Sequence, residues 1–178
     1  MKEITLHNKR FEVFISETEI SAIVHSIAKN INESRIKDPL FIAVLNGSFL
    51  FVADVMRKIT IPNAEISFIK LASYSGTEST GEVNKLIGIS EDIKGRNVII
   101  LEDIIDTGIT LEKIICLLKK ENVNSIKTAT LLFKPDAYKK NIHIDFIGKS
   151  IPNDFVVGYG LDYDEIGRNL PHIYKLKD

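Results

Sequence analysis

Apolar and polar residues form two different patterns along the chain, and the first pattern has the period of a helix. Between residues 16 and 34, apolar side chains recur every three or four positions: Ile20, Ile23, Val24, Ile27, Ala28 and Ile31. This spacing places them on one face of an amphipathic helix, and Ser16 followed by Glu19 forms a capping-box pattern at its start. The pattern predicts a helix over 16–34.

Runs rich in apolar residues make up the second pattern and predict strands, and the continuous run LFIAVL (40–45) predicts a strand that is covered on both faces. These runs are LFIAVL (40–45), EISFIKLA (65–72), NVIIL (97–101) and KTATLLF (127–133). Helical segments separate them, because FLFVADVMRKI (49–59) follows the first run and Ile109 to Lys120 lies between the last two. The alternation predicts an α/β fold with a parallel core sheet flanked by helices. Ligands of such sheets bind beyond the carboxyl ends of the strands.

The last third of the chain departs from this alternation. Short apolar runs at 145–148 and 155–160 have no full helical segment between them, which predicts an irregular or antiparallel arrangement. No repeat, low-complexity stretch or long linker interrupts the 178 residues. We therefore expect a single domain over 1–178.

Composition narrows the possible partners. Lys and Arg number 23 against 24 Asp and Glu, a net charge of −1, so no overall cationic field exists to hold nucleic acid or an anionic membrane. No apolar run approaches the ~18 residues of a membrane span, and the first residues lack a signal-peptide core. The lone Cys116 lies in an apolar stretch, so we expect it to be buried and the chain to be cytoplasmic.

The segment VIILEDIIDTGIT, residues 98–110, carries the candidate chemistry. Glu102 and Asp103 end an apolar run, where two carboxylates are costly to desolvate unless vicinal hydroxyls or a metal ion satisfy them. The DTGIT segment at 106–110 is a small, hydroxyl-bearing turn into a helix, and the free N–H groups of a helix start suit a phosphate. The alternative is that Asp106 or Thr107 merely caps the helix while the acidic pair faces solvent.

Four apolar residues, an acidic pair, two apolar residues and Asp-Thr-Gly-x-Thr together resemble the signature of the phosphoribosyltransferases that use 5-phosphoribosyl 1-diphosphate. The resemblance extends to the hypoxanthine-guanine branch and covers nearly the whole chain, from LNGSF (45–49) to GRNLP (167–171). It implies the type I phosphoribosyltransferase fold with a small hood formed from the terminal regions. It also implies Mg²⁺-dependent transfer of the phosphoribosyl group to hypoxanthine or guanine, giving IMP or GMP and diphosphate. A homodimer or homotetramer is implied as well.

The resemblance also implies roles for the residues of the signature. Glu102 and Asp103 would hold the ribose hydroxyls, and Asp106 would be the acid/base partner of the purine. The residues implied to bind the 5′-phosphate are Asp106, Thr107, Gly108, Ile109 and Thr110. The acids implied to lie near the magnesium ion are Glu102, Asp103 and Asp162.

Further positions match the family's base and diphosphate sites. Lys134 would donate to the exocyclic oxygen of a 6-oxopurine, and Phe155 would stack on the base beside Val156 and Asp162. The residues implied to bind diphosphate are Leu45, Asn46, Gly47 and Arg168, and the peptide bond in the first three is often cis in the family. Asn46 is neutral where family members frequently carry a charge, so only a backbone role is expected there. Ser73 and Tyr74 match the pair of a lid over the site.

Plainer interpretations exist for each of these positions. Lys134 could be a solvated lysine, Phe155 a core aromatic, and Asp162 and Arg168 surface residues. The 73–82 segment could be a surface hairpin. For the whole chain, the alternative is a non-catalytic regulator on the same fold that senses nucleotides or binds RNA or DNA. Such a regulator would be expected to lose a base-pocket residue or gain a basic face, and the preference among hypoxanthine, guanine and xanthine stays open.

Overall fold

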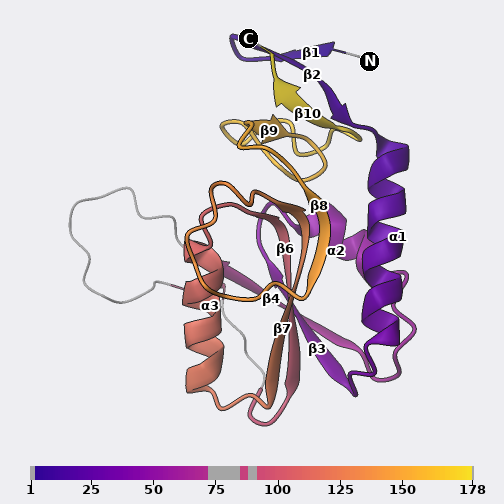
Figure 1. Ribbon diagram of the computed structural model, residues 1–178, viewed down its shortest axis with the longest axis vertical. Coiled ribbons are helices and arrows are strands. Elements are labelled where there is room, and N and C mark those ends of the chain that lie inside the picture. Colours follow the sequence, from indigo (N-terminus) through magenta and orange to yellow (C-terminus); the bar gives the residue numbers. More distant parts are fainter. Residues whose placement is uncertain (1–2, 72–84, 88–91, 178) are drawn as a thin grey trace, which may run out of the picture.

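The computed structural model describes residues 3–71, 85–87 and 92–177, which form two sheets and three helices. The larger sheet has the strand order β5-β4-β3-β6-β7-β8 (Figure 1). Its strands are β3 (Pro39–Val44), β4 (Glu65–Leu71), β5 (Lys85–Ile87), β6 (Asn97–Ile105), β7 (Ser125–Phe133) and β8 (Phe146–Ser150). The helices are α1 (Glu17–Glu33), α2 (Phe49–Met56) and α3 (Ile109–Lys120).

The core of the larger sheet is parallel, as the apolar runs predict. β3 pairs in parallel with β4 and β6, β6 with β7, and β7 with β8, while β5 adds an antiparallel edge. Every residue of β3 is buried, because α1 and α2 cover one face of the sheet and α3 covers the other (Figure 1). The α/β fold class with helices on both faces is therefore confirmed.

The helices begin where their sequence signals place them. Ser16 is the N-cap of α1 and its side chain accepts a hydrogen bond from the backbone N–H of Glu19 at 3.2 Å, which confirms the predicted cap. The bounds of α3 agree with the prediction. Helix α2 ends at Met56, three residues before the end of the predicted helix.

Three predictions need correction. Strand β6 continues to Ile105, so the acidic pair lies inside the strand rather than after it, because pairing with β7 extends through Ile105. Strand β8 pairs in parallel with β7, because residues 134–145 form a crossover without a helix that is long enough to return the chain. Cys116 is exposed, because the face of α3 that packs on the sheet is made by Leu111, Ile114 and Leu118.

The smaller sheet joins the two ends of the described chain. Its strands run in the order β1-β2-β10-β9, all antiparallel, with β1 (Glu3–Leu6), β2 (Lys9–Ile15), β9 (Val156–Val157) and β10 (Ile173–Leu176). It lies beyond the end of the larger sheet, above α1 in Figure 1. The antiparallel pairing expected for 155–160 is confirmed at β9, whereas β1 and β2 were not predicted.

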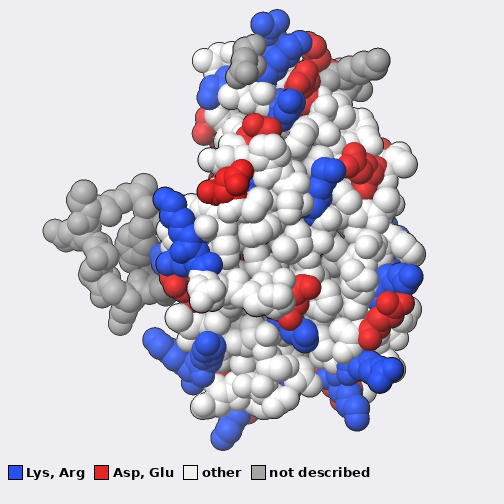
Figure 2. Space-filling model, in the orientation of Figure 1, with Lys and Arg blue, Asp and Glu red and all other residues white. Residues whose placement is uncertain are grey.

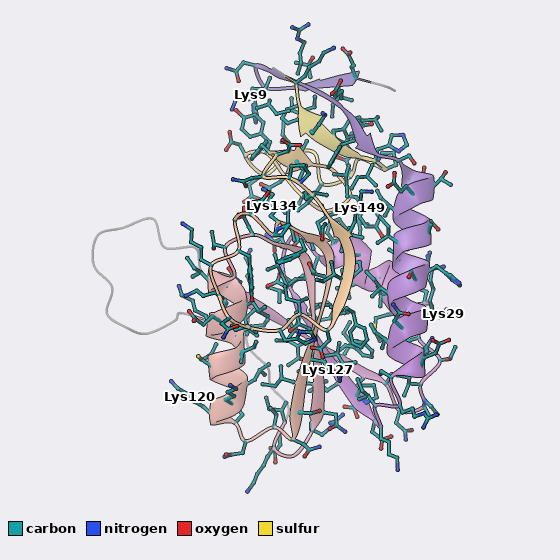
Figure 3. The ribbon with its side chains drawn as sticks, in the orientation of Figure 1. Lys9, Lys29, Lys120, Lys127, Lys134 and Lys149 are labelled. Atoms are coloured by element: carbon teal, nitrogen blue, oxygen red, sulfur yellow. The ribbon has the colours of Figure 1, made fainter. Side chains whose placement is uncertain are left out.

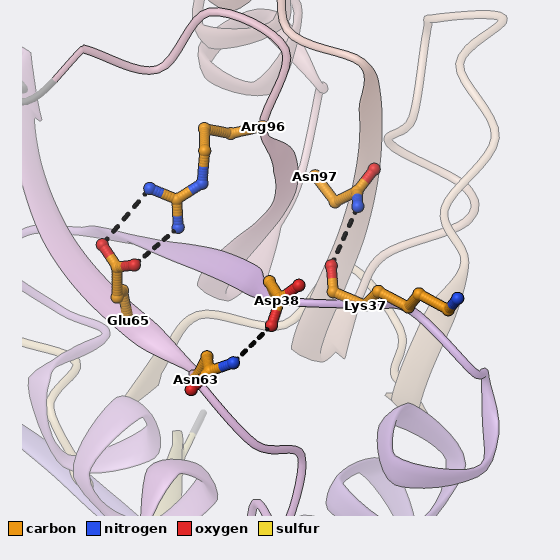
Figure 4. Close-up of polar contacts among 6 residues, drawn as sticks. All are labelled: Lys37, Asp38, Asn63, Glu65, Arg96 and Asn97. Carbon is orange, nitrogen blue, oxygen red and sulfur yellow. Dashed lines mark hydrogen bonds and ion pairs between the residues drawn. The ribbon is translucent and has the colours of Figure 1, made fainter.

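Polar contacts fasten the amino-terminal ends of the core strands (Figure 4). Both terminal nitrogens of the Arg96 guanidinium donate to Glu65, the Asn63 amide donates to Asp38 at 2.8 Å, and Asn97 donates to the Lys37 carbonyl at 2.9 Å. These contacts leave the carboxyl ends of the strands, at the opposite end of the sheet, to the loops that form the site.

The surface carries charges of both signs. On the face shown in Figure 2, basic and acidic side chains are interspersed. None of the helices in the described residues is long and apolar enough to cross a membrane.

Candidate active site

The acidic pair projects from β6 in two directions. Glu102 is buried, with 5% of its surface exposed, and it lines a cavity of about 90 Å³ together with the loop that follows β6. Asp103 points the other way, because a Cβ atom on Gly47 would overlap its carboxylate. Strand alternation thus gives one carboxylate to the 106–110 loop and the other to the 45–47 loop.

Burial dominates the electrostatics of this pair. It raises the pKa of Glu102 well above its ordinary value, and the charge of Asp103 adds to that rise. Burial also raises the pKa of Asp103 to about 6, against the lowering effect of two backbone N–H groups and of Arg168. Each of these desolvated carboxylates, on its own side of the strand, suits sugar hydroxyls or a share in binding a hard cation such as magnesium.

The 106–110 loop presents an open helix start. Gly108 is the N-cap of α3 with a φ of 81°, and no side chain caps the helix through it. The hydroxyl of Thr107 accepts from the N–H of Ile109 only at 3.5 Å, so neither Asp106 nor Thr107 provides a regular cap. Thr110, in the first turn, is exposed. The backbone N–H groups of this turn can therefore bind an anion.

Lys134 reaches the same loop from the end of β7. Its Nζ lies 3.3 Å from Asp106 Oδ2, and its backbone N–H donates to the carbonyl of Ile105 at 3.0 Å. The residue is 8% exposed, which excludes the solvated lysine of the plainer interpretation. Figure 3 shows Lys134 where the larger sheet faces the smaller one.

Arg168 and Asp162 close the side of the site that the 45–47 loop forms. The Arg168 guanidinium lies 2.8 Å from Asp162 and donates to the Gly160 carbonyl at 3.0 Å. A Cβ atom on Gly160 would overlap the Gly47 carbonyl oxygen, so these two backbones are in direct contact. The peptide bond between Leu45 and Asn46 is cis. Segment 160–168, the 45–47 loop and Asp103 therefore meet at one place.

Phe155 has a free ring face. It is 44% exposed, and its ring packs against Tyr163 and Phe11 at centroid distances of 5.6 and 6.2 Å. Phe155 is thus not a core aromatic, while Val156 beside it is buried in β9. Phe11, which is fully buried, and Tyr163 thus support the ring of Phe155. Sequence reasoning did not predict these contacts, because Phe11 lies far from Phe155 in the chain and an aromatic residue in a turn has no local signature of a binding site.

The predicted metal ligands do not assemble as a complete group, and the predicted lid residues are not described. Among the described residues, no three His, Cys, Asp or Glu side chains are placed to hold a metal ion, so Glu102, Asp103 and Asp162 do not form a metal site by themselves. The physical reason is that the first two point in opposite directions and the third is paired with Arg168. Ser73 and Tyr74 lie outside the described residues.

The fold and this acidic strand define a phosphoribosyltransferase-type domain, and residues 16–164 match the family model of the phosphoribosyl transferase domain. Curated hypoxanthine-guanine phosphoribosyltransferases of Staphylococcus epidermidis and Staphylococcus aureus are 43% and 41% identical to the chain over 174 residues. Each match covers 97% of this chain and 97% of the relative. The chain belongs to the hypoxanthine-guanine phosphoribosyltransferase family.

Solved structures agree with this assignment. A hypoxanthine phosphoribosyltransferase of Staphylococcus aureus matches with a TM-score of 0.85 and 40% identity, over 93% of this chain and 91% of that one. A hypoxanthine-guanine phosphoribosyltransferase of Bacillus anthracis, solved with a HEPES molecule in its active site, matches with a TM-score of 0.84 and 38% identity, over 94% and 97%. The type I fold is confirmed. These relatives bear the names of enzymes, so the alternative of a non-catalytic regulator is not supported.

Proposed function

We propose that the chain transfers the 5-phosphoribosyl group of 5-phosphoribosyl 1-diphosphate to hypoxanthine or guanine, giving IMP or GMP and diphosphate. The observation that carries the proposal is the division of β6 between two loops. Glu102 faces an open helix start that suits a phosphate, and Asp103 faces a loop that contacts the segment of Arg168. A pentose with anionic groups at both ends fits this arrangement.

In the proposed complex, Glu102 and Asp103 accept hydrogen bonds from the ribose hydroxyls. The turn from Asp106 to Thr110 binds the 5′-phosphate through backbone N–H groups and hydroxyls. The 45–47 backbone and Arg168 bind the diphosphate, so both ends of the donor are held before the chemical step.

The reaction is a displacement at the anomeric carbon of the ribose. One imidazole nitrogen of the purine forms the new carbon–nitrogen bond with its lone pair, the bond to the diphosphate oxygen breaks, and the proton of the other imidazole nitrogen passes to the Asp106 carboxylate. Positive charge develops on the sugar during this step, and the carboxylates of Glu102 and Asp103 stabilise it. Glu102, Asp103 and Asp162 are the acids that would hold Mg²⁺ together with the donor, and the ion would neutralise charge on the diphosphate as it leaves.

Base selection rests on Lys134 and Phe155. The buried Lys134 ammonium donates to an exocyclic oxygen of the purine, which the amino group of adenine could not accept. The exposed ring of Phe155 stacks on the base. Val156 supplies backbone contacts.

We also propose that the smaller sheet acts as the hood over this pocket, that the chain forms a homodimer or homotetramer, and that it works in the cytoplasm.

A steady-state assay tests the proposal. The purified chain is supplied with 5-phosphoribosyl 1-diphosphate and with hypoxanthine, guanine, xanthine or adenine, each with and without Mg²⁺. We expect IMP and GMP only with Mg²⁺, and no AMP from adenine. Absence of any nucleotide product, or equal rates with adenine and hypoxanthine, would contradict the proposal.

A further inference from the structure

Tyr159 makes a partly buried hydrogen bond that the mechanism above does not use. It is 6% exposed, and its hydroxyl donates to Asp54 Oδ2 in α2 at 2.6 Å, across 105 positions of the chain. The other carboxylate oxygen of Asp54 accepts from Arg57 at 3.0 Å. Burial and the neighbouring Asp54 carboxylate raise the pKa of Tyr159, so the hydroxyl stays protonated and remains a donor.

The two partners stand at sensitive places in the site. Asp54 belongs to the helix that starts directly after the 45–47 loop. Tyr159 immediately precedes Gly160, whose backbone touches the carbonyl of Gly47 and binds Arg168 through both its N–H and its carbonyl. Besides the backbone contact between Gly160 and Gly47, this side-chain contact ties the helix that follows the diphosphate loop to the segment that carries Asp162 and Arg168.

The backbone around Tyr159 has an uncommon conformation. Gly158, Tyr159 and Gly160 all have positive φ, with values of 104°, 50° and 99°. Only the two glycines adopt such angles freely, so the tyrosine is held in its conformation by its surroundings. Its backbone N–H donates to the Leu170 carbonyl at 2.9 Å, and its hydroxyl supplies the contact to α2.

We propose that the Tyr159 hydroxyl and the Asp54 carboxylate form a clamp that sets the distance between the 45–47 loop and Arg168, and thereby the affinity for the diphosphate end of the donor. This inference rests on the proposed function of the site. Tyr159 is a positioning residue: it acts through Gly160 and Arg168, on the donor rather than on the purine.

Variants that lack the hydroxyl can still fold. The hydrogen bond lies at the wall of a cavity of about 280 Å³ that Tyr159 and Asp54 line together with Glu17, Arg57 and Lys58. Water can therefore replace the lost donor at Asp54, which also keeps its pairing with Arg57. The ring of Tyr159→Phe fills the same space as the native ring.

The experiment measures the Kd of 5-phosphoribosyl 1-diphosphate by calorimetry and the KM of donor and purine separately. For Tyr159→Phe we expect donor Kd and KM to rise about tenfold, the range of one hydrogen bond to a charged group, while the purine KM stays within about twofold. Asp54→Leu should behave alike. Asp54→Asn keeps a carbonyl acceptor for the tyrosine and should restore most of the donor affinity. The double variant Tyr159→Phe/Asp54→Leu should be no worse than either single one.

Arg96→Met is the matched control, because it removes a hydrogen-bonded pair at the far end of the sheet and should change neither constant. Unchanged donor affinity in Tyr159→Phe would overturn the clamp, as would equal rises for donor and purine. If the wild type binds the donor more tightly than Tyr159→Phe does but makes no nucleotide, the result would contradict the proposed function and support the clamp. A wild type that binds no donor would overturn both.

Discussion

The pairing of Asp106 with Lys134 is the residue-scale feature on which the proposed chemistry depends. The two side chains are 3.3 Å apart, with the Asp106 side chain half-exposed and Lys134 buried. A purine that enters between them can receive a hydrogen bond from Lys134 at its oxygen and give its ring proton to Asp106. The ion pair of the free chain keeps both groups close together, as the neighbouring exocyclic oxygen and imidazole nitrogen of the purine require in the proposed complex.

Replacement of Asp106 by Asn removes the proton acceptor and keeps the shape of the side chain. We expect kcat to fall by ~10² or more, the usual scale for loss of an acid/base group, with a smaller change in donor KM. Steady-state rates of IMP formation measure this, with the exposed Asp136→Asn as control. Equal rates for Asp106→Asn and the parent would remove Asp106 from the mechanism.

The raised pKa of Asp103 predicts how the free energy of unfolding depends on pH. Its pKa in the folded chain is about 6 against an ordinary value of 3.8, so between these values the folded state holds a proton that the unfolded state has lost. The contribution of this group to the free energy of unfolding therefore falls as pH rises from about 4 to 6, and the loss persists above pH 6.

Asp103→Asn cannot ionise and escapes this loss. We expect the variant to melt at a higher temperature than the parent above pH 6, with the difference shrinking as pH falls towards 4, while its affinity for the donor drops. Thermal melts across this range measure the first effect. A difference in melting temperature that is the same at pH 4 and pH 8 would refute the buried-carboxylate account.

The positions at the carboxyl ends of β3, β6 and β7 could be anticipated because they follow runs rich in apolar residues, whereas the roles proposed for them rest on the resemblance to the family. Other features have no local signal. Charged residues interrupt the apolar pattern of Lys9–Ile15, so this half-exposed strand was not predicted. The contact between Tyr159 and Asp54 joins positions far apart in the chain. Cys116 shows the same limit, since an apolar stretch does not reveal which side of α3 packs on the sheet.

At the scale of elements, the start of α3 depends on Gly108. Its φ of 81° is open to glycine, and a Cβ atom there would overlap the ring of Tyr138. The carbonyl of Thr107, just before it, accepts from the N–H of Lys139 at 3.2 Å. The crossover after β7 therefore packs directly on the proposed phosphate loop and fixes its shape.

Gly108→Ala should both destabilise the chain and weaken donor binding. A non-glycine residue in this backbone region costs ~1–3 kcal/mol, and the clash with Tyr138 shifts the loop that holds the 5′-phosphate. Gly95→Ala is a matched control, because Gly95 has a similar φ of 71° with nothing near its Cβ position. We expect both variants to melt earlier and only Gly108→Ala to raise donor KM. Equal donor KM in the two variants would contradict the role of this loop.

At the scale of the whole molecule, the proposed pocket lies between two sheets that are built from different parts of the chain. The larger sheet carries the acidic pair and leads into the phosphate turn and Lys134, and Phe155 directly precedes strand β9 of the smaller sheet. The parallel sheet follows from local apolar runs. The smaller sheet depends on pairing between β2 and β10, which are distant in sequence, so its strands could not be read from the residues of either end alone.

A crystal structure of the chain with 5-phosphoribosyl 1-diphosphate and Mg²⁺ tests the central claim most directly. We expect the ribose hydroxyls to lie on Glu102 and Asp103, the 5′-phosphate in the turn from Asp106 to Thr110, and the diphosphate between the 45–47 loop and Arg168. A donor bound elsewhere, or a site left empty at saturating donor, would contradict the account.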